Sequence, residues 1–448
     1  MNNLQITNSL SNKKEIFIPI NPKKISLYVC GPTVYDDPHV GNGRALVVFD
    51  LLYRVLIELF GKDEVAYVRN ITDIDDKIIE ASNKTKKSIS ELTLEVTNNF
   101  HSDCKSLFCL KPSKEPKATE HVDEMISMTK DLIKKGAAYE NKGHVYFMVS
   151  SFKNYGKLSN KNLDELVSGA RVKVSEFKKD PLDFVLWKPS LDKEPGWESP
   201  WGRGRPGWHL ECSVMSEKYL GKHFDIHGGG LDLIFPHHEN EIAQSCCNNN
   251  TESFANYWVH NGFLTINKEK MSKSLGNIIS ISEAVKKYSG QVIRLALLSA
   301  HYSQPLDWND ELLKNQEGVL NKWYSLYSDE KKDFEIDEIL LDDLNTPGFI
   351  ARIHELYNAA IKGDNEKKLR FNFACRLIGL FSVNKKDWDK TKRDKINISE
   401  SFIISKIEER AKAKNNGNFS LADKIREELL AKGILIEDQK GKTIWKFK

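Results

Sequence analysis

Side chains that can bind a metal recur in the second half of the sequence, and two of them lie four residues apart. His237 and Glu241 follow Pro236, and a helix that opens at this proline would place both side chains on one face. Thiolates from Cys30 and Cys212 would complete a tetrahedral set of sulfur, nitrogen and oxygen donors, all of which zinc accepts. The first candidate site is therefore a zinc centre built from these four residues.

The residue types alone leave other choices open. Cys246 and Cys247 lie nearer to Glu241 along the chain, and His238 can replace His237. Buried free cysteines are also commonly no more than small hydrophobic residues. A packed core without a metal remains an alternative at this stage.

A second candidate site lies where a predicted strand turns into a long helix. The apolar run that begins at Ser26 stops at Gly31, and a helical pattern covers residues 44–60, just past Gly41-Asn42-Gly43. A helix N-terminus beside glycines suits a phosphate group. The P-loop pattern is missing and the third glycine of the dinucleotide fingerprint is absent, so an ordinary tight turn is the alternative.

The elements that must position these residues indicate a parallel sheet. Residues 16–20, 26–30 and 65–69 are apolar runs that predict strands, and helix 44–60 joins the last two into a βαβ unit. Residues 70–77 follow at the carboxyl end of a strand, where open α/β sheets bind ligands. Their acidic side chains can instead cap the next helix.

The expected fold class is α/β, with five regions. A Rossmann-like catalytic domain covers 1–118 and 204–250, and 119–203 form an inserted domain whose end is rich in Pro, Gly and Trp. Residues 251–307 carry a lysine-rich motif, 308–397 form an α-helical bundle that ends in a charged linker at 384–397, and 398–448 form a small α+β domain of two helices and a hairpin.

Composition narrows the class of protein. A net charge of +3, from 66 basic and 63 acidic residues, means that nucleic acid would bind only to local patches. Seven cysteines without regular spacing indicate a reducing compartment. The sequence shows no signal peptide and no long uncharged apolar run, so we expect a cytoplasmic protein without a membrane partner. It shows no heptad seam, so we expect a monomer.

Two motifs together resemble those of a known class of enzymes. Residues 39–42, His-Val-Gly-Asn, and 270–274, Lys-Met-Ser-Lys-Ser, resemble the HIGH and KMSKS signatures of class I aminoacyl-tRNA synthetases, in the same order. Further segments resemble those of cysteinyl-tRNA synthetases, namely residues 30–36, 207–212, 225–230 and 235–241. Together with 70–77, the resemblance covers most of the chain, and it implies that 251–307 contact an RNA stem.

The resemblance implies one zinc ion in the amino-acid pocket, held by Cys30, Cys212, His237 and Glu241. Zinc deprotonates a coordinating thiol, whereas the hydroxyl of serine is a poor ligand. A metal would thus separate cysteine from serine, where shape alone gives about a hundredfold between near-isosteres. An editing domain would not be needed.

The resemblance also implies contacts with the other substrates. A catalytic role falls to His39, Asn42, Lys270 and Lys273, which would position the phosphates and stabilise charge on the leaving pyrophosphate, with Mg²⁺ accompanying ATP. The implied ATP-binding residues are His39, Gly41, Asn42, Gly228, Gly229, Gly230, Asp232, Lys270 and Lys273, and the implied cysteine-binding residues are Cys30, Gly31, Thr72, Trp208 and His227.

Two positions depart from the HIGH pattern, Val40 and Asn42. Valine is a conservative replacement, and asparagine can donate a hydrogen bond but carries no charge, so His39 has the larger expected role. The C-terminal region resembles the anticodon-recognition domain of the family, in which Asp423 would read a base, Phe419 would stack and Lys414 would bind phosphate. A surface helix with ordinary charges explains these three residues equally well.

We therefore expect a ligase that activates L-cysteine with ATP and transfers it to the 3′ end of tRNA(Cys). A related ligase that joins activated cysteine to an amino sugar is a second hypothesis, against which the region beyond residue 397 argues. A catalytically silent RNA-binding protein is a third, against which the intact His39, Lys270 and Lys273 argue.

Overall fold

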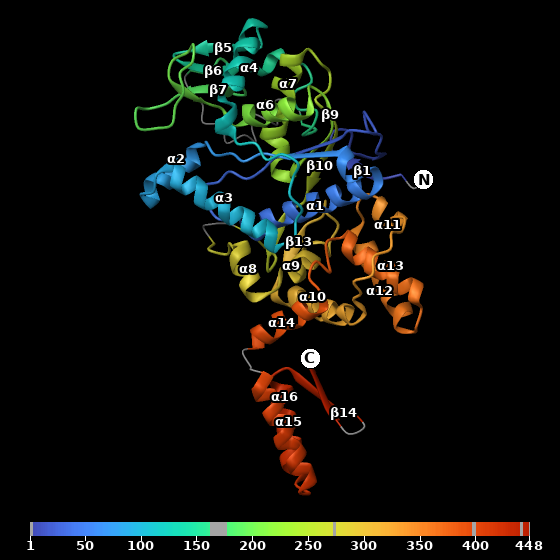
Figure 1. Cartoon of the computed structure of the whole chain (residues 1–448). Helices are drawn as coiled ribbons and strands as arrows, with labels where there is room; N and C mark the ends of the chain where they lie inside the picture. The colour runs from blue at the N-terminus through green and yellow to red at the C-terminus, as the bar shows by residue number, and fades with distance from the viewer. Residues whose placement is uncertain (1–2, 162–176, 272–274, 397–399, 440–441, 448) are drawn as a thin grey trace. The chain divides into compact units, whose positions relative to one another are not determined.

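The computed structural model describes residues 3–161, 177–271, 275–396, 400–439 and 442–447 (Figure 1). The chain forms two compact units, Met1–Asn321 with Glu330–Leu380 and Lys322–Asp329 with Phe381–Lys448. Within the described ranges, no helix combines the length and the apolar character that crossing a membrane requires.

A parallel sheet forms the centre of the first unit, with strands in the order β10-β9-β3-β4. Their bounds are β3 Ile25–Val29, β4 Val65–Arg69, β9 Phe224–Gly230 and β10 Ala255–Asn261. The chain passes from β3 to β4 on one side and returns to β9 on the other side of β3. The carboxyl end of β3 is therefore a topological switch point, where such sheets bind ligands. The predicted α/β fold class is confirmed.

The N-terminal segment differs from the prediction. The strand predicted at 16–20 is wrong, because Ile18 and Ile20 donate their backbone N–H groups to the Tyr257 hydroxyl and the Asp225 carboxylate. The preceding residues form an antiparallel hairpin of β1 Gln5–Asn8 and β2 Lys13–Ile16. Pro19 follows this hairpin and cannot donate to a sheet, which explains why the apolar run does not continue as a strand.

Helix α1, Val40–Phe60, connects β3 to β4 and begins four residues before the predicted start at Arg44. His39 caps it, so Gly41 and Gly43 lie in its first turn rather than in the preceding loop. A Cβ at Gly43 would lie 3.4 Å from the Ile281 side chain, so the first turn packs closely against the chain beyond residue 275.

A buried ion cluster ties the middle of α1 to the rest of the first unit. Asp50 accepts from Arg54 at 2.7 Å and pairs with Arg294 of α9 (Gly290–Leu297), whose side chain is fully buried. Arg294 also donates to the carbonyl oxygens of Ile378 at 2.6 Å and Leu107 at 3.2 Å. Because buried charges need partners, this cluster is a structural cross-link.

An antiparallel sheet in the order β5-β6-β7-β8 lies between β4 and β9 in sequence, with bounds β5 Ala138–Asn141, β6 His144–Phe147, β7 Phe184–Pro189 and β8 Gly204–Pro206. One hydrophobic core joins it to the parallel sheet and includes Tyr28, Met125, Trp187 and Trp258. The helices that contribute to this core are α4 Val122–Lys134, α6 Trp208–Leu220 and α7 Glu239–Asn249. Helices α2 Asp76–Thr85 and α3 Ile89–Ser106 follow β4 and pack against each other. Helix α7 therefore begins at Glu239, three residues beyond the predicted start.

A second small sheet, in the order β12-β11-β13, follows β10. Its strands are β11 Leu264–Ile266, β12 Glu269–Lys270 and β13 Leu306–Trp308. The remaining helices of this part of the chain are α8 Ile281–Lys287, α9 Gly290–Leu297, α10 Asp310–Trp323, α11 Glu338–Leu341, α12 Thr346–Ile361 and α13 Asn365–Leu377.

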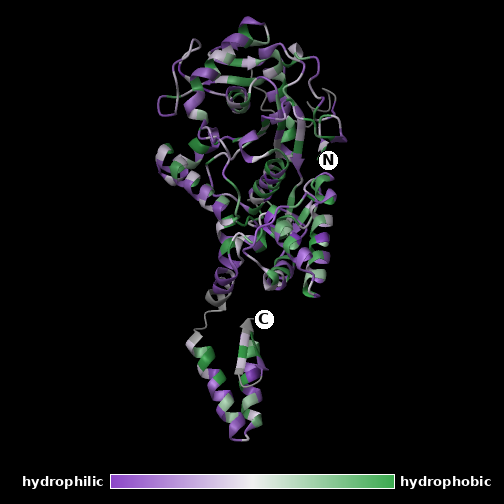
Figure 2. Ribbon diagram, turned by 45° about the vertical axis from the view of Figure 1, so that its right-hand side comes forward, coloured by the Kyte–Doolittle hydropathy of each residue, from purple (hydrophilic) through white to green (hydrophobic). Residues whose placement is uncertain are grey.

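The second unit contains α14 Lys385–Ile396, α15 Glu400–Asn415, α16 Phe419–Ala431 and a hairpin of β14 Ile434–Gln439 and β15 Lys442–Phe447. Hydrophobic and hydrophilic residues alternate along α15 and α16, as expected for helices with one buried face (Figure 2). The linker predicted at 384–397 is instead helical, because Trp388 is buried and stacks on Tyr324 at 4.5 Å. The five domain boundaries expected from the sequence stay a prediction.

Candidate active site

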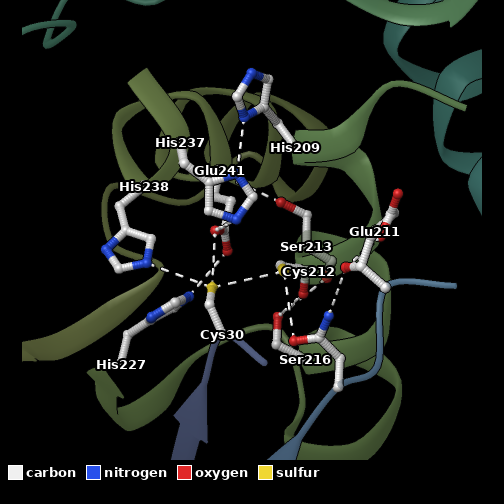
Figure 3. A network of polar contacts seen from close by, with 12 residues as sticks. Cys30, His209, Glu211, Cys212, Ser213, Ser216, His227, His237, His238 and Glu241 are labelled. Atoms are coloured by element: carbon white, nitrogen blue, oxygen red, sulfur yellow. Dashed lines mark hydrogen bonds and ion pairs between the residues drawn. The ribbon is translucent and has the colours of Figure 1, made fainter. Parts of the chain in front are cut away.

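The four ligand-type side chains predicted to form a zinc set meet at the carboxyl end of β3 (Figure 3). Cys30 follows β3, Cys212 lies in α6, His237 precedes α7 and Glu241 lies in its first turn. Cys30 Sγ lies 3.6 Å from Cys212 Sγ and 3.5 Å from Glu241 Oε1, and His237 Nε2 lies 3.0 Å from the same oxygen. The possible ligand atoms all lie within 4.8 Å of one another.

His237 presents one ring nitrogen to this cluster. Its Nδ1 lies 2.9 Å from His209 Nδ1, and its ring stacks on Trp208 with centroids 4.1 Å apart. Its Nε2 is buried and makes no hydrogen bond, even though Glu241 is close. A buried ring nitrogen without a hydrogen bond is costly unless a cation binds it. The residues present therefore fit a metal ion.

The charges of the cluster lead to the same conclusion. Burial raises the pKa of the Cys212 thiol, but the nearby Cys30 thiol and His237 ring outweigh this and lower it to about 6. Burial, together with Cys212, raises the pKa of Cys30 well above its usual value. Burial disfavours the Glu241 carboxylate, yet His227 and His237 lower its pKa to about 2. The pocket thus favours the anionic forms of Cys212 and Glu241 beside a positively charged His237, whose pKa is raised to about 10 by these two groups despite its burial, and a bound metal ion would take over this compensating charge.

A second possible ligand group overlaps the first and contains Cys30, His227, His238 and Glu241. His238 Nε2 lies 3.4 Å from Cys30 Sγ, and His227 Nε2 lies 2.9 Å from Glu241 Oε2. The alternative in which His238 replaces His237 therefore has a geometric basis. His238 Nδ1 in turn lies 2.8 Å from His260 Nε2 of β10, a contact between elements that the sequence did not reveal.

The alternative in which Cys246 or Cys247 supplies a metal ligand is not favoured. Cys246 is buried in the hydrophobic core and Cys247 packs against that core, and neither belongs to a possible ligand group in the described part of the chain. Burial raises the pKa of the Cys246 thiol to about 11, which disfavours the thiolate that binds metals.

Asn70 organises the wall of the pocket and was not predicted as a site residue. Its Oδ1 accepts from Gly31 N at 2.8 Å and lies 3.7 Å from Cys212 Sγ, and its Nδ2 donates to Thr72 Oγ1 at 3.1 Å. Thr72 Oγ1 donates to Glu211 at 2.9 Å. A Cβ at Gly31 would lie 1.6 Å from the Asn70 carbonyl oxygen, so only glycine fits there. The position of Asn70 directly after β4 was the available signal.

The predicted cysteine-pocket residues Trp208 and His227 lie beside the cluster. Trp208 is half-buried against His237. His227 is fully buried, stacks on Trp258 with centroids 4.4 Å apart and contacts Glu241. His227 thus supports a possible ligand in addition to bordering the pocket.

His39 and Asn42 cap the N-terminus of α1 reciprocally. His39 Nδ1 accepts from Asn42 N at 3.2 Å, and Asn42 Oδ1 accepts from His39 N at 3.0 Å. This is a capping box in which asparagine occupies the third helical position. The departure from the HIGH pattern at residue 42 therefore has a structural role, whatever its contact with a phosphate.

We expect Asn42→Ala to lower the free energy of unfolding by about 1 kcal/mol, because it removes one of the two capping hydrogen bonds. Asn42→Asp retains the acceptor for His39 N and should stay within about 0.5 kcal/mol of the parent. Urea denaturation followed by circular dichroism measures both. Equal stability of Asn42→Ala and the parent protein would contradict the capping role.

The described part of the KMSKS-like motif, Lys270 and Met271, lies beside the HIGH-like motif. A Cβ at Gly41 would lie 2.9 Å from the Met271 Cε atom, and Val40 N donates to Ile279 O at 2.9 Å. Lys270 ends β12 with its side chain exposed. Lys273 lies outside the described residues, so its predicted role is untested by the structure.

Three of the four glycines predicted to bind ATP, those of residues 228–230, have close neighbours in the protein itself. A Cβ at Gly228 would lie 2.2 Å from the Phe49 ring, and one at Gly229 would lie 2.8 Å from the His238 ring. At Gly230 the corresponding neighbour is Asp232, at 2.4 Å, whose side chain is exposed. Packing thus accounts for the first two glycines, while Gly230 and Asp232 stand at the open end of β9.

The predicted anticodon residues belong to the second unit. Lys414 Nζ lies 2.6 Å from Asp438 Oδ2, and Arg410 pairs with the same carboxylate. Phe419 begins α16 and is 65% exposed, and Asp423 is exposed one turn further on. Phe419 and Asp423 therefore share one helix face, whereas Lys414 already has an acidic partner.

Comparison with known families identifies the class of protein. The family described as "tRNA synthetases class I (C) catalytic domain" matches residues 16–318, more than half of the chain. The matched region contains the parallel sheet, the cluster of possible metal ligands and both motifs.

Curated relatives narrow this class. A cysteine–tRNA ligase of Pelagibacter ubique is 56% identical over 447 residues, covering 99% of both chains. The corresponding proteins of Rickettsia bellii and Beijerinckia indica are 48% and 46% identical, each again over 99% of both chains. The chain belongs to the cysteine–tRNA ligase family.

Solved structures agree on the fold. A methionyl-tRNA synthetase of Mycobacterium tuberculosis, in complex with methionyl-adenylate, superimposes with a TM-score of 0.54 at 14% identity and covers 84% of this chain and 86% of its own. A leucyl-tRNA synthetase of Agrobacterium radiobacter gives 0.55 at 11% identity, covering 81% and 83%. At such identities the likeness concerns the fold alone.

Proposed function

We propose that this chain attaches L-cysteine to tRNA(Cys) in two steps driven by ATP. The cysteine carboxylate attacks the α-phosphate, forming cysteinyl-adenylate and releasing pyrophosphate, and the acyl group then passes to a hydroxyl of the terminal adenosine of the tRNA, releasing AMP. The observation that supports the proposal is that, in one unit of a family member, a cluster of possible metal ligands occurs together with the HIGH-like motif and the described part of the KMSKS-like motif. Neither step needs a side-chain nucleophile, so the residues act by positioning and by stabilising charge.

In this proposal Cys30, Cys212, His237 and Glu241 hold one zinc ion per chain. Two sulfurs, one nitrogen and one oxygen form a donor set that zinc accepts. When bound, zinc supplies a ligand position that a substrate thiolate fills well and a serine hydroxyl fills poorly. The contact with His209 orients the His237 ring and keeps Nε2 directed at the cluster.

Residues beside the cluster bind the rest of the cysteine molecule. The proposed contacts are Gly31, Thr72, Trp208 and His227, together with Cys30. Thr72 is held by Asn70 and Glu211, and the Trp208 ring is held against His237. These contacts limit the freedom of the pocket walls before substrate binds, which reduces the entropy lost on binding.

The first turn of α1 binds the ATP phosphates. Because His39 Nδ1 accepts the Asn42 N–H, the neutral ring carries its proton on Nε2 and can donate it to a phosphate oxygen. Lys270 and Lys273 stabilise the charge that develops on the leaving pyrophosphate. The adenosine and its Mg²⁺-bound phosphates contact the remaining predicted residues, Gly41, Gly228, Gly229, Gly230 and Asp232.

The second unit recognises the tRNA. Phe419 and Asp423, on one face of α16, are the proposed contacts with anticodon bases, and Lys414 is the proposed phosphate contact. Lys414 must release Asp438 to make it. Action as a monomer in the cytoplasm also remains part of the proposal.

The decisive experiment is cysteine-dependent exchange of radiolabelled pyrophosphate into ATP, without tRNA. We expect exchange with cysteine and background with serine, loss of exchange after the metal is removed by a chelator, and recovery on adding Zn²⁺. Absence of exchange in the metal-loaded protein would refute the proposed enzymatic activity. Transfer of the activated cysteine to tRNA(Cys), and not to an amino sugar, would then separate this function from that of the related ligases.

A further inference from the structure

Arg44, in the second turn of α1, has an unusual environment for a buried cation. Its side chain is fully buried, and its guanidinium donates to four backbone carbonyl oxygens at 2.5–3.2 Å. These carbonyls belong to Gly262, Phe263, His301 and Gln304. Within the described ranges no carboxylate pairs with Arg44, and its Nε atom has no hydrogen-bond partner.

The four carbonyls mark two junctions of the chain. Gly262 and Phe263 connect β10 of the parallel sheet to β11, and His301 and Gln304 precede β13. The junctions are themselves in close contact, because a Cβ at Gly262 would lie 2.7 Å from the carbonyl oxygen of Gln304. One side chain of α1 therefore hydrogen-bonds both segments that lead into the small sheet, the one before β11 and the one before β13.

Burying the Arg44 guanidinium costs folding free energy that an apolar side chain at this position would not cost. Burial lowers the pKa of Arg44 to about 10, so the group stays charged at neutral pH without an ionic partner. Burying a charge is unfavourable unless hydrogen bonds compensate it. A flat guanidinium with a fixed fork of donors can bond two separate loops at once, and an ammonium group cannot reproduce that geometry.

The small sheet in turn carries Lys270. Strand β12 pairs with β11 through Thr265 and Lys270. Beyond the motif, the chain is fixed to α1 again, because Val40 N of this helix donates to Ile279 O at 2.9 Å. The chain on both sides of the motif is thus bonded to the N-terminal part of the helix that His39 caps.

We infer that Arg44 is a positioning residue for adenylate formation, holding the sheet of Lys270 at a set distance from His39. The inference rests on the proposed function, in which these two residues act on the same phosphates. Arg44 itself does not touch the substrate. Its contribution is to fix the relative positions of Lys270 and His39, which lie on different segments of the chain.

The test compares Arg44→Lys and Arg44→Met with Arg294→Lys. Arg294 is the matched control, because it is equally buried and also binds backbone carbonyls, but it links α9 to Asp50, away from β11. We expect the Arg44 variants to lower kcat for cysteine-dependent exchange about 10- to 100-fold and to raise the KM for ATP, since small misplacements of reacting groups have effects of this size. The KM for cysteine should change less than about threefold, as should the transfer rate from preformed cysteinyl-adenylate to tRNA.

If Arg44 has a purely structural role, its variants should lower the rates of adenylate formation and of transfer together. Arg294→Lys should then lower both rates to the same extent, when variants of equal melting temperature are compared. That result would overturn the inference. If Arg44→Met does not fold, Arg44→Lys and hydrogen exchange at the β11–β12 pairing decide the question, with faster exchange expected there and not in the control. Inactivity of the parent protein would instead refute the proposed function.

Discussion

Replacing Cys212 with serine is expected to raise the KM for cysteine about a thousandfold and to leave the KM for ATP within about threefold. Serine retains the size of the residue but cannot supply a thiolate, so one of the four proposed zinc ligands is lost. The loss of about 4 kcal/mol of metal-dependent binding would fall on the substrate that contacts the metal. Steady-state exchange assays give both KM values, and atomic emission spectrometry gives the zinc content of the same samples.

Cys246→Ser is the matched control for this variant. Cys246 is also buried, lies on α7 together with Glu241 and belongs to neither possible ligand group. We expect it to retain one zinc per chain and an unchanged KM for cysteine. A Cys212→Ser protein with full zinc content and unaltered cysteine affinity would show that the metal assignment is wrong.

Substitution of Lys270 by alanine is expected to lower kcat for exchange about 100- to 1,000-fold, with a smaller effect on the KM for cysteine. A positioned charge that stabilises the leaving group in the transition state contributes on this scale. The exposed side chain at the end of β12 makes few contacts that folding requires, so the melting temperature should change little. Single-turnover measurement of adenylate formation separates this step from product release.

Lys268 supplies the control for Lys270. It is exposed two residues earlier, and its backbone N–H is bound by Asp307, so Lys268→Ala removes an equal charge from the same loop. We expect less than a threefold change in kcat. Equal losses in both variants would mean that the general positive charge of the segment matters and that Lys270 has no specific role.

Much of the catalytic fold was predictable because it depends on local patterns. The runs at 26–30 and 65–69 and the apolar helix between them indicate a parallel βαβ unit, and β3, α1 and β4 confirm it within a few residues. The i,i+4 spacing of His237 and Glu241 likewise predicts that the two side chains meet, and they do. Such relations involve only neighbouring turns or a single crossover.

Local patterns were misleading where a distant contact replaces a local one. The run 16–20 has the composition of a strand, but its backbone binds side chains of β9 and β10 instead. The charged run 384–397 has the composition of a linker, but burial of Trp388 stabilises a helix there. In both cases tertiary contacts outweigh intrinsic propensity.

The kinds of groups available follow directly from the amino-acid sequence: thiols, imidazoles and a carboxylate for a metal, and a histidine and lysines for phosphates. Which of them meet was decided by the tertiary structure, because Cys30 and Cys212 are 182 residues apart and come together only through the strand order β9-β3-β4. The same holds for Arg44, whose partners are backbone carbonyls more than 200 residues away. Backbone acceptors are identical in every residue, so no sequence pattern can reveal which of them a buried guanidinium will bind.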